Sequence, residues 1–201
     1  MIWIFEHLIE IIASILGLIG IFLQIKQNSW YWLISILMVI LYIHVFYESK
    51  FYADMTFQFY YLGISIYGWI YWIKDRKKYN VSQKKIKIIA KKLNFKQIIF
   101  SIVISLFFWI IIYFILKKFT DSDVTIGDSF TTALSIVATF LLARKFIENW
   151  LFWIIVDFVS TILYISKELY PTALLFSVLT ILAFVGFFKW RKNWFYNVLC
   201  G

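Results

Sequence analysis

Seven apolar stretches follow one another along the chain, and short polar segments separate them. A helix of about 20 residues, rising about 1.5 Å per residue, spans the hydrocarbon core of a bilayer. The stretches cover residues 8–25, 30–48, 52–73, 97–116, 125–143, 149–167 and 171–189. This pattern predicts an all-α, polytopic membrane protein with seven transmembrane helices.

The composition supports a membrane protein and excludes several other classes. Hydrophobic residues make up 63% of the 201 residues, whereas a soluble domain averages about 45–50%. The net charge of +9 is concentrated in the segments beside the spans, which favours contact with membrane lipid and excludes nucleic acid as a partner. The first ten residues carry Glu6 and Glu10 and lack the basic start of a cleavable signal peptide, so we expect an uncleaved first span.

Lysine and arginine residues gather at one end of the expected bundle. Residues 74–96 alone hold ten of them, and alternation of the spans places sixteen on this side against four on the other. The positive-inside rule therefore predicts an N-terminus outside the inner membrane and a C-terminus in the cytoplasm.

A weak internal repeat relates the first and last parts of the chain. The residues that recur at an offset of 118 positions are Trp32, Gly68 and Trp72 in the first copy and Trp150, Gly186 and Trp190 in the second. The pair Ser49-Lys50 recurs as Ser166-Lys167 at an offset of 117. Each copy has three spans, and the single span between them restores the orientation, so we expect parallel repeats in a 3+1+3 bundle. The expected divisions are residues 1–74 (first repeat), 75–96 (basic cytoplasmic loop), 97–120 (linker helix), 121–192 (second repeat) and 193–201 (cytoplasmic tail).

The sixth span carries the strongest functional signal. Trp150, Trp153 and Asp157 follow one another at three- and four-residue steps, so they share one helix face. A carboxylate near the bilayer midplane costs roughly 2.5–3.5 kcal/mol on insertion scales, which indicates a ligand or a structural partner for Asp157. Two indoles and a carboxylate suit a flat, cationic or hydroxylated molecule. Packing or anchoring at the membrane interface is the alternative for Trp150 and Trp153.

Polar stripes on other spans predict a shared cavity between the repeats, because polar groups in lipid need partners. The stripe of the third span consists of Asp54, Gln58, Tyr61, Ser65, Gly68, Trp69 and Trp72, and that of the fifth span of Asp128, Thr131, Thr132, Ser135 and Thr139. The candidate substrate-binding residues are Asn149, Trp150, Trp153, Asp157 and Tyr164 of the sixth span, with Gln58, Tyr61, Trp69, Thr131 and Thr132. Interface anchors are expected at Trp3, Trp30, Trp190 and Trp194.

The block from Glu148 to Asp157, ENWLFWIIVD, is the most specific part of a resemblance to the PnuC family of vitamin transporters. The resemblance covers nearly the whole chain and is densest in residues 28–72 and 128–190. It implies a seven-helix bundle related to the SWEET sugar transporters, and facilitated diffusion of a vitamin. The best-known cargo of the family is nicotinamide riboside, which a cytoplasmic kinase traps by phosphorylation. The resemblance also suggests a homotrimer.

Several alternatives remain beside nicotinamide riboside. Thiamin is also cationic and heteroaromatic and fits the same side chains, and a proton-coupled carrier would use Asp157 as its relay. A membrane enzyme would need paired catalytic groups at one depth, and a sensor would need a soluble signalling domain; the sequence shows neither. No histidine pairs with other ligands at metal spacing, and no cofactor motif occurs. We therefore predict a transporter without metal or cofactor.

Overall fold

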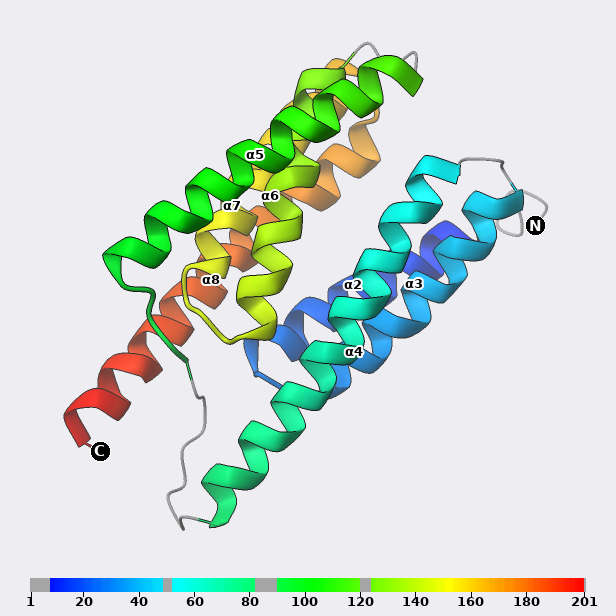
Figure 1. Cartoon of the computed structure of the whole chain (residues 1–201). Coiled ribbons are helices and arrows are strands. Elements are labelled where there is room, and N and C mark those ends of the chain that lie inside the picture. The colour runs from blue at the N-terminus through cyan, green and yellow to red at the C-terminus, as the bar shows by residue number, and fades with distance from the viewer. Residues whose placement is uncertain (1–7, 49–51, 82–89, 120–123, 201) are drawn as a thin grey trace. The chain divides into compact units, whose positions relative to one another are not determined.

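A computed structural model describes residues 8–48, 52–81, 90–119 and 124–200 (Figure 1). These residues form seven α-helices and no β-strand beyond one isolated bridge. The helices are α2 (Leu8–Ile25), α3 (Trp30–Glu48), α4 (Tyr52–Val81), α5 (Phe95–Phe119), α6 (Thr125–Ala143), α7 (Asn149–Ser166) and α8 (Tyr170–Cys200). The predicted all-α class is confirmed.

Among the described residues, four helices are long and apolar enough to cross a membrane: α5, α6, α7 and the part of α8 from Tyr170 to Tyr196. Two helices run past their predicted ends. We expected the third span to end at residue 73 and the seventh at residue 189, yet α4 continues to Val81 and α8 to Cys200. The basic residues there mark the expected surface of the membrane and do not end the helix, because the i→i−4 backbone hydrogen bonds of a helix do not require lipid. The predicted basic loop therefore begins as helix, and the predicted tail is helical.

The chain divides into two compact units, residues 1–88 and 89–201. In the first unit α3 packs against both α2 and α4. In the second unit α7 packs against both α6 and α8, and α5 packs against α6 (Figure 1). The helix α5, which we expected as a separate linker, is therefore part of the second unit. Its buried side chains are few, namely Ser101, Ser105 and Ile112, and its apolar remainder suits contact with lipid.

The three helices α2–α4 and the three helices α6–α8 have matching boundaries at an offset of 118 residues. Helix α2 ends at Ile25 and α6 at Ala143, while α4 begins at Tyr52 and α8 at Tyr170. Each group therefore repeats nearly the same lengths of helix and connector, with paired helices differing by one residue. How the two groups are arranged about each other stays a prediction.

The first connector of each group also has the same backbone. Gln27 and Lys145, 118 residues apart, both adopt the left-handed conformation, with φ of 49° and 62°. The next residue, Asn28 or Phe146, donates its N–H to the carbonyl five positions earlier at 2.9 Å. This is the Schellman ending of a helix. The shared bonds indicate two copies of one supersecondary unit.

Each group is held by a contact that we call the tryptophan clamp. It consists of Trp32, Gly68 and Trp72 in the first unit and of Trp150, Gly186 and Trp190 in the second. In both clamps the indoles meet edge to face with centroids 5.5 Å apart, at interplanar angles of 86° and 87°. All four indoles are buried. The predicted interface anchor at Trp190 is therefore wrong, because this indole packs between helices.

Glycine is required in the clamp because an indole lies against the helix backbone. A Cβ atom on Gly68 would lie 2.5 Å from Trp32, and one on Gly186 would lie 2.6 Å from Trp150. We expect Gly68→Ala and Gly186→Ala to lower the free energy of unfolding by about 1–3 kcal/mol through overpacking. Thermal unfolding of the purified protein in detergent measures this loss.

Gly63→Ala is the matched control for this prediction. Gly63 lies on α4 like Gly68, but a Cβ atom there would meet nothing within 4 Å. Its replacement is expected to be neutral or to stabilise by up to about 1 kcal/mol, because alanine favours helix more than glycine does. Equal unfolding temperatures for the three variants would contradict the clamp.

Candidate functional site

Helix α7 turns its polar face inward and its apolar face outward. Its buried residues are Asn149, Trp150, Val156, Asp157 and Ser160. Its exposed residues include Leu151, Ile155, Phe158, Ile162 and Ile165. The predicted division of this helix into two faces is confirmed. The inward face is therefore available for packing and for ligand contact.

Asp157 is buried near the middle of α7, with 5% of its surface exposed. Its backbone carbonyl accepts a hydrogen bond from the Thr161 hydroxyl at 2.8 Å. Its carboxylate makes no hydrogen bond or ion pair to any residue that the structure describes. A buried carboxylate without a partner is costly. A ligand that supplies charge or hydrogen-bond donors would remove this cost.

Two more unpartnered polar atoms lie on the same side of α7, at four-residue steps from Asp157. The indole N–H of Trp153 is buried and has no hydrogen-bond partner in the described part of the chain. Asn149 is completely buried; its Nδ2 donates to the Phe146 carbonyl, but its Oδ1 has no partner there. Successive turns thus offer an amide oxygen, an N–H donor and a carboxylate. This set suits a ligand with an amide and hydroxyl groups.

Trp150 has a structural role in the clamp, which is the packing alternative that the sequence left open. Its indole N–H is buried without a partner, and so is that of Trp32 in the other clamp. Since Trp32 is not a candidate for ligand contact, the unpartnered N–H is a property of the clamp. It is therefore no sign of a ligand at Trp150.

Residues 118 positions apart can be compared between the two groups of helices. The comparison distinguishes the contacts that both groups have from the side chains that only α7 has. The clamp recurs in both, whereas Trp153 and Asp157 correspond to Ser35 and Val39 of α3. In the first unit the Ser35 hydroxyl is hydrogen-bonded to the Ser65 hydroxyl of α4 at 2.9 Å. Where α3 has a serine and a valine, α7 has an indole and a carboxylate. These differences distinguish the candidate site from the shared scaffold.

The threonines of α6 belong to the same unit as Asp157. A Cβ atom on Gly127 would lie 2.6 Å from Leu163, so α6 and α7 are in close contact at this level. Because the helices are antiparallel (Figure 1), Thr131 and Thr132 lie level with the middle of α7. The Thr131 hydroxyl is satisfied within α6, by the Gly127 carbonyl at 3.0 Å. Thr132 is half-buried and makes no side-chain hydrogen bond among the described residues, so it is the better ligand candidate.

The candidates on α4 lie in the first unit. They are Gln58, Tyr61 and Trp69, all of them half-buried. Three other members of the expected stripe, Ser65, Gly68 and Trp72, pack against α3. Part of the stripe is therefore the contact between α3 and α4 and is not free to line a cavity. A cavity between the two units stays a prediction.

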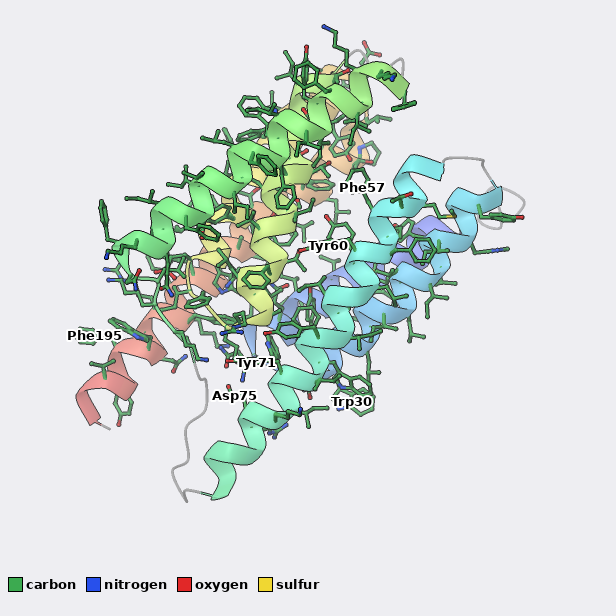
Figure 2. The ribbon with its side chains drawn as sticks, viewed as in Figure 1. Trp30, Phe57, Tyr60, Tyr71, Asp75 and Phe195 are labelled. Carbon is green, nitrogen blue, oxygen red and sulfur yellow. The ribbon has the colours of Figure 1, made fainter. Side chains whose placement is uncertain are left out.

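Aromatic residues near the helix ends differ in their roles. The ring of Tyr164 packs on that of Phe176, with centroids 5.0 Å apart, so this candidate also joins α7 to α8. Trp30, an expected anchor, is 64% exposed at the start of α3, and Phe195 is exposed in the last turns of α8 (Figure 2). Exposed aromatic residues at helix ends are typical of a membrane interface.

Sequence reasoning missed one polar group beside the site. Glu148 directly precedes α7, and its carboxylate accepts a hydrogen bond from the Leu93 N–H at 3.1 Å. Burial raises the pKa of this carboxyl group, while the Leu93 N–H and the charge of Lys92 act against that rise. No local sequence pattern indicates this hydrogen bond, because Leu93 lies 55 residues away from Glu148 in the chain. Among the described residues no group of three His, Cys, Asp or Glu side chains could hold a metal ion.

The chain is similar in sequence to known proteins. Residues 7–192 match the model of a family described as nicotinamide mononucleotide transporter. The nicotinamide riboside transporter PnuC of Escherichia coli (strain K12) is 24% identical over 205 residues, which covers 92% of this chain and 85% of the relative. The protein of the same name from Shigella flexneri has the same identity and coverage.

A solved structure shows the same fold. The crystal structure of the vitamin B3 transporter PnuC matches with a TM-score of 0.73 and 20% identity. The match covers 96% of this chain and 84% of the solved one.

Proposed function

The chain belongs to the nicotinamide mononucleotide transporter family, and from this premise we propose that it carries nicotinamide riboside across the membrane. Membership makes it a multi-pass membrane transporter and not an enzyme. Two relatives of nearly full length are named nicotinamide riboside transporters, which supports the riboside as cargo.

The observation that carries the proposal is the buried residue Asp157, whose carboxylate has no partner among the described residues and which follows Trp153 by one helical turn. Nicotinamide riboside has a cationic pyridinium ring, a carboxamide and ribose hydroxyls. The indole can stack on the ring, an interaction worth about 0.5–2 kcal/mol. The carboxylate can accept hydrogen bonds from hydroxyls and offset the positive charge. Asn149 and Thr132 add an acceptor and a hydroxyl on the same unit.

The same chemistry distinguishes the riboside from the mononucleotide. A phosphate adds close to two negative charges at neutral pH. The ten candidate residues include one carboxylate and no lysine or arginine. Like charges in a low-dielectric site repel strongly. We therefore expect the phosphorylated compound to bind more weakly than the riboside.

The proposed mode is facilitated diffusion by alternating access between two three-helix repeats. The matching boundaries and clamps of α2–α4 and α6–α8 support two similar bodies that rock against each other. Phosphorylation of the cargo in the cytoplasm would then trap it and maintain the inward gradient. The basic residues at one end support an inner-membrane orientation with the C-terminus in the cytoplasm.

Calorimetric titration of the purified protein tests the cargo. Nicotinamide riboside, its mononucleotide and thiamin are titrated in parallel into the same preparation. We expect micromolar binding of the riboside, corresponding to about −8 kcal/mol, and much weaker binding of the other two. Tightest binding of thiamin would replace the cargo and keep the transporter, and no binding to folded protein would refute the proposal.

Uptake of nicotinamide riboside into vesicles tests the mode of transport. Facilitated diffusion predicts that the direction of net flux follows the gradient of nicotinamide riboside alone. A steep dependence on an imposed pH gradient would instead make Asp157 a proton relay.

A further inference from the structure

Residues 90–94, which we call the linker strap, run beside the α6–α7 connector in the second unit. The Lys91 N–H donates to the Lys145 carbonyl at 2.8 Å, and the Ile147 N–H donates to the Lys91 carbonyl at 2.8 Å. These two bonds form a parallel bridge between Lys91 and Phe146. The strap is therefore fixed to the connector through its backbone.

A third bond joins the strap to the start of α7. The Glu148 carboxylate accepts the Leu93 N–H at 3.1 Å. The Leu93 side chain, 6% exposed, forms a hydrophobic cluster with Val137 and Leu141 of α6. Packed around this cluster are Ile98, Ile104, Phe108, Phe146 and Phe152. The strap thus binds α5, α6 and α7 together at one end of the unit.

The strap also contacts α8 and has no counterpart in the described residues of the first unit. The ammonium group of Lys92 lies 5.4 Å from the centroid of the Trp194 ring. The position of Glu148 is taken in the first unit by Trp30, which is 64% exposed. There the start of α3 is capped locally, by the Asn28 side chain, which accepts the Trp30 N–H at 3.1 Å. The additional attachment belongs to the helix that carries the candidate site.

We propose that Glu148 is a positioning residue for the substrate site: by holding Leu93, it fixes the first turn of α7. Asn149 follows it directly in the chain, and Trp153 lies little more than one turn beyond. Ligand groups must be held within a fraction of an ångström for full affinity, so the anchoring of their helix contributes to binding. This inference rests on the proposed function of the α7 face.

Glu148→Ala and Glu148→Gln test the proposal together. Alanine removes the acceptor, so we expect faster hydrogen exchange of the amides in residues 90–94. We also expect about five- to tenfold weaker binding of nicotinamide riboside, as for the loss of one hydrogen bond. The unfolding temperature should stay near the wild-type value, because the change is local. Glutamine keeps an acceptor oxygen and should restore both protection and affinity.

Glu168→Ala is the matched control. It removes the same charge from the exposed α7–α8 connector at the other end of the helix, and we expect wild-type exchange and affinity. Faster exchange in Glu148→Ala with unchanged affinity would overturn the positioning role, and so would weaker affinity with a fully protected strap. Failure of the wild type to bind the riboside would refute the proposed function instead, while the exchange data would still report the attachment.

A crosslink tests the strap during transport. Bridge partners lie within the Cα separations that disulfides span, about 4.4–6.8 Å, so Lys91→Cys with Phe146→Cys should form a disulfide on oxidation. Cys200→Ser removes the only native cysteine. If the strap stays attached to the α6–α7 connector throughout the transport cycle, uptake of nicotinamide riboside should be equal before and after oxidation. Loss of uptake on oxidation would show that the strap detaches during the cycle and would overturn the positioning role.

Discussion

Trp150→Ala is expected to destabilise the protein by about 3–5 kcal/mol, the usual cost of a large aromatic residue removed from a core. The indole is completely buried and lies against Gly186 and Trp190. Truncation leaves a cavity between α7 and α8 that the rigid glycine surface cannot fill. Thermal unfolding in detergent and the yield of folded protein measure the loss.

Trp32→Ala is the matched control, because the same contact recurs in the first unit. Its indole is equally buried and lies against Gly68 and Trp72. The two variants should lose similar stability if Trp150 is a packing residue. Trp150→Phe, which keeps part of the contact, provides folded protein for titration. Its affinity for nicotinamide riboside should change by less than about threefold, or 0.7 kcal/mol.

The opposite pattern would return Trp150 to the ligand site. Wild-type stability combined with lost binding in Trp150→Phe would show that the indole contacts the cargo. A larger loss of affinity for nicotinamide riboside in Trp150→Ala than in Trp32→Ala would point the same way. The experiment therefore separates the two roles that the spacing of the tryptophans left open.

The helix boundaries could be predicted where polar residues lie at both ends of a span. The predicted spans 30–48 and 125–143 match α3 and α6, because charged or polar residues flank both. The predicted span and the helix have different ends where the helix continues past the apolar stretch, as α4 does to Val81. Hydrophobicity indicates where a chain is expected to reach the membrane surface, whereas helix propensity indicates where a helix ends. These two positions differ where a helix has a basic end.

The roles of individual tryptophans were harder to predict than their spacing. The repeat of Trp32, Gly68 and Trp72 was visible in the sequence, but spacing alone does not say which helix a residue faces. The second clamp was consequently divided between a predicted anchor, Trp190, and a predicted ligand contact, Trp150. The glycine four residues before each second tryptophan was the informative signal, because it leaves room for an indole from another helix.

The linker strap could not have been predicted from local pattern. Its short run of residues, Ala90–Asn94, has neither the alternation nor the β-branched content of a strand. Its order comes from a connector more than 50 residues later in the chain, through two backbone bonds and Glu148. Contacts of this kind depend on tertiary structure.

Asp157→Asn should lower the affinity for nicotinamide riboside by roughly ten- to a hundredfold, the effect of losing a charged hydrogen-bond partner worth about 1.5–3 kcal/mol. Asp157 is 5% exposed, and its carboxylate makes no hydrogen bond or ion pair within the described residues. Asparagine has nearly the same shape; it removes the charge and replaces one acceptor oxygen with an NH2 donor. Calorimetric titration of the folded variant measures the change.

Stability provides the second half of this test, because the two roles of Asp157 predict opposite signs. A carboxylate kept for its ligand costs free energy in the empty protein, so its neutral replacement should keep or raise the unfolding temperature. A structural carboxylate would instead leave its partners unpaired when replaced, and stability would fall while affinity changed little. Charge dependence adds a third measurement: the reduced, uncharged riboside should lose less affinity than the cationic form. Equal losses for both ligands would mean that Asp157 contacts the ribose and does not offset the charge of the ring.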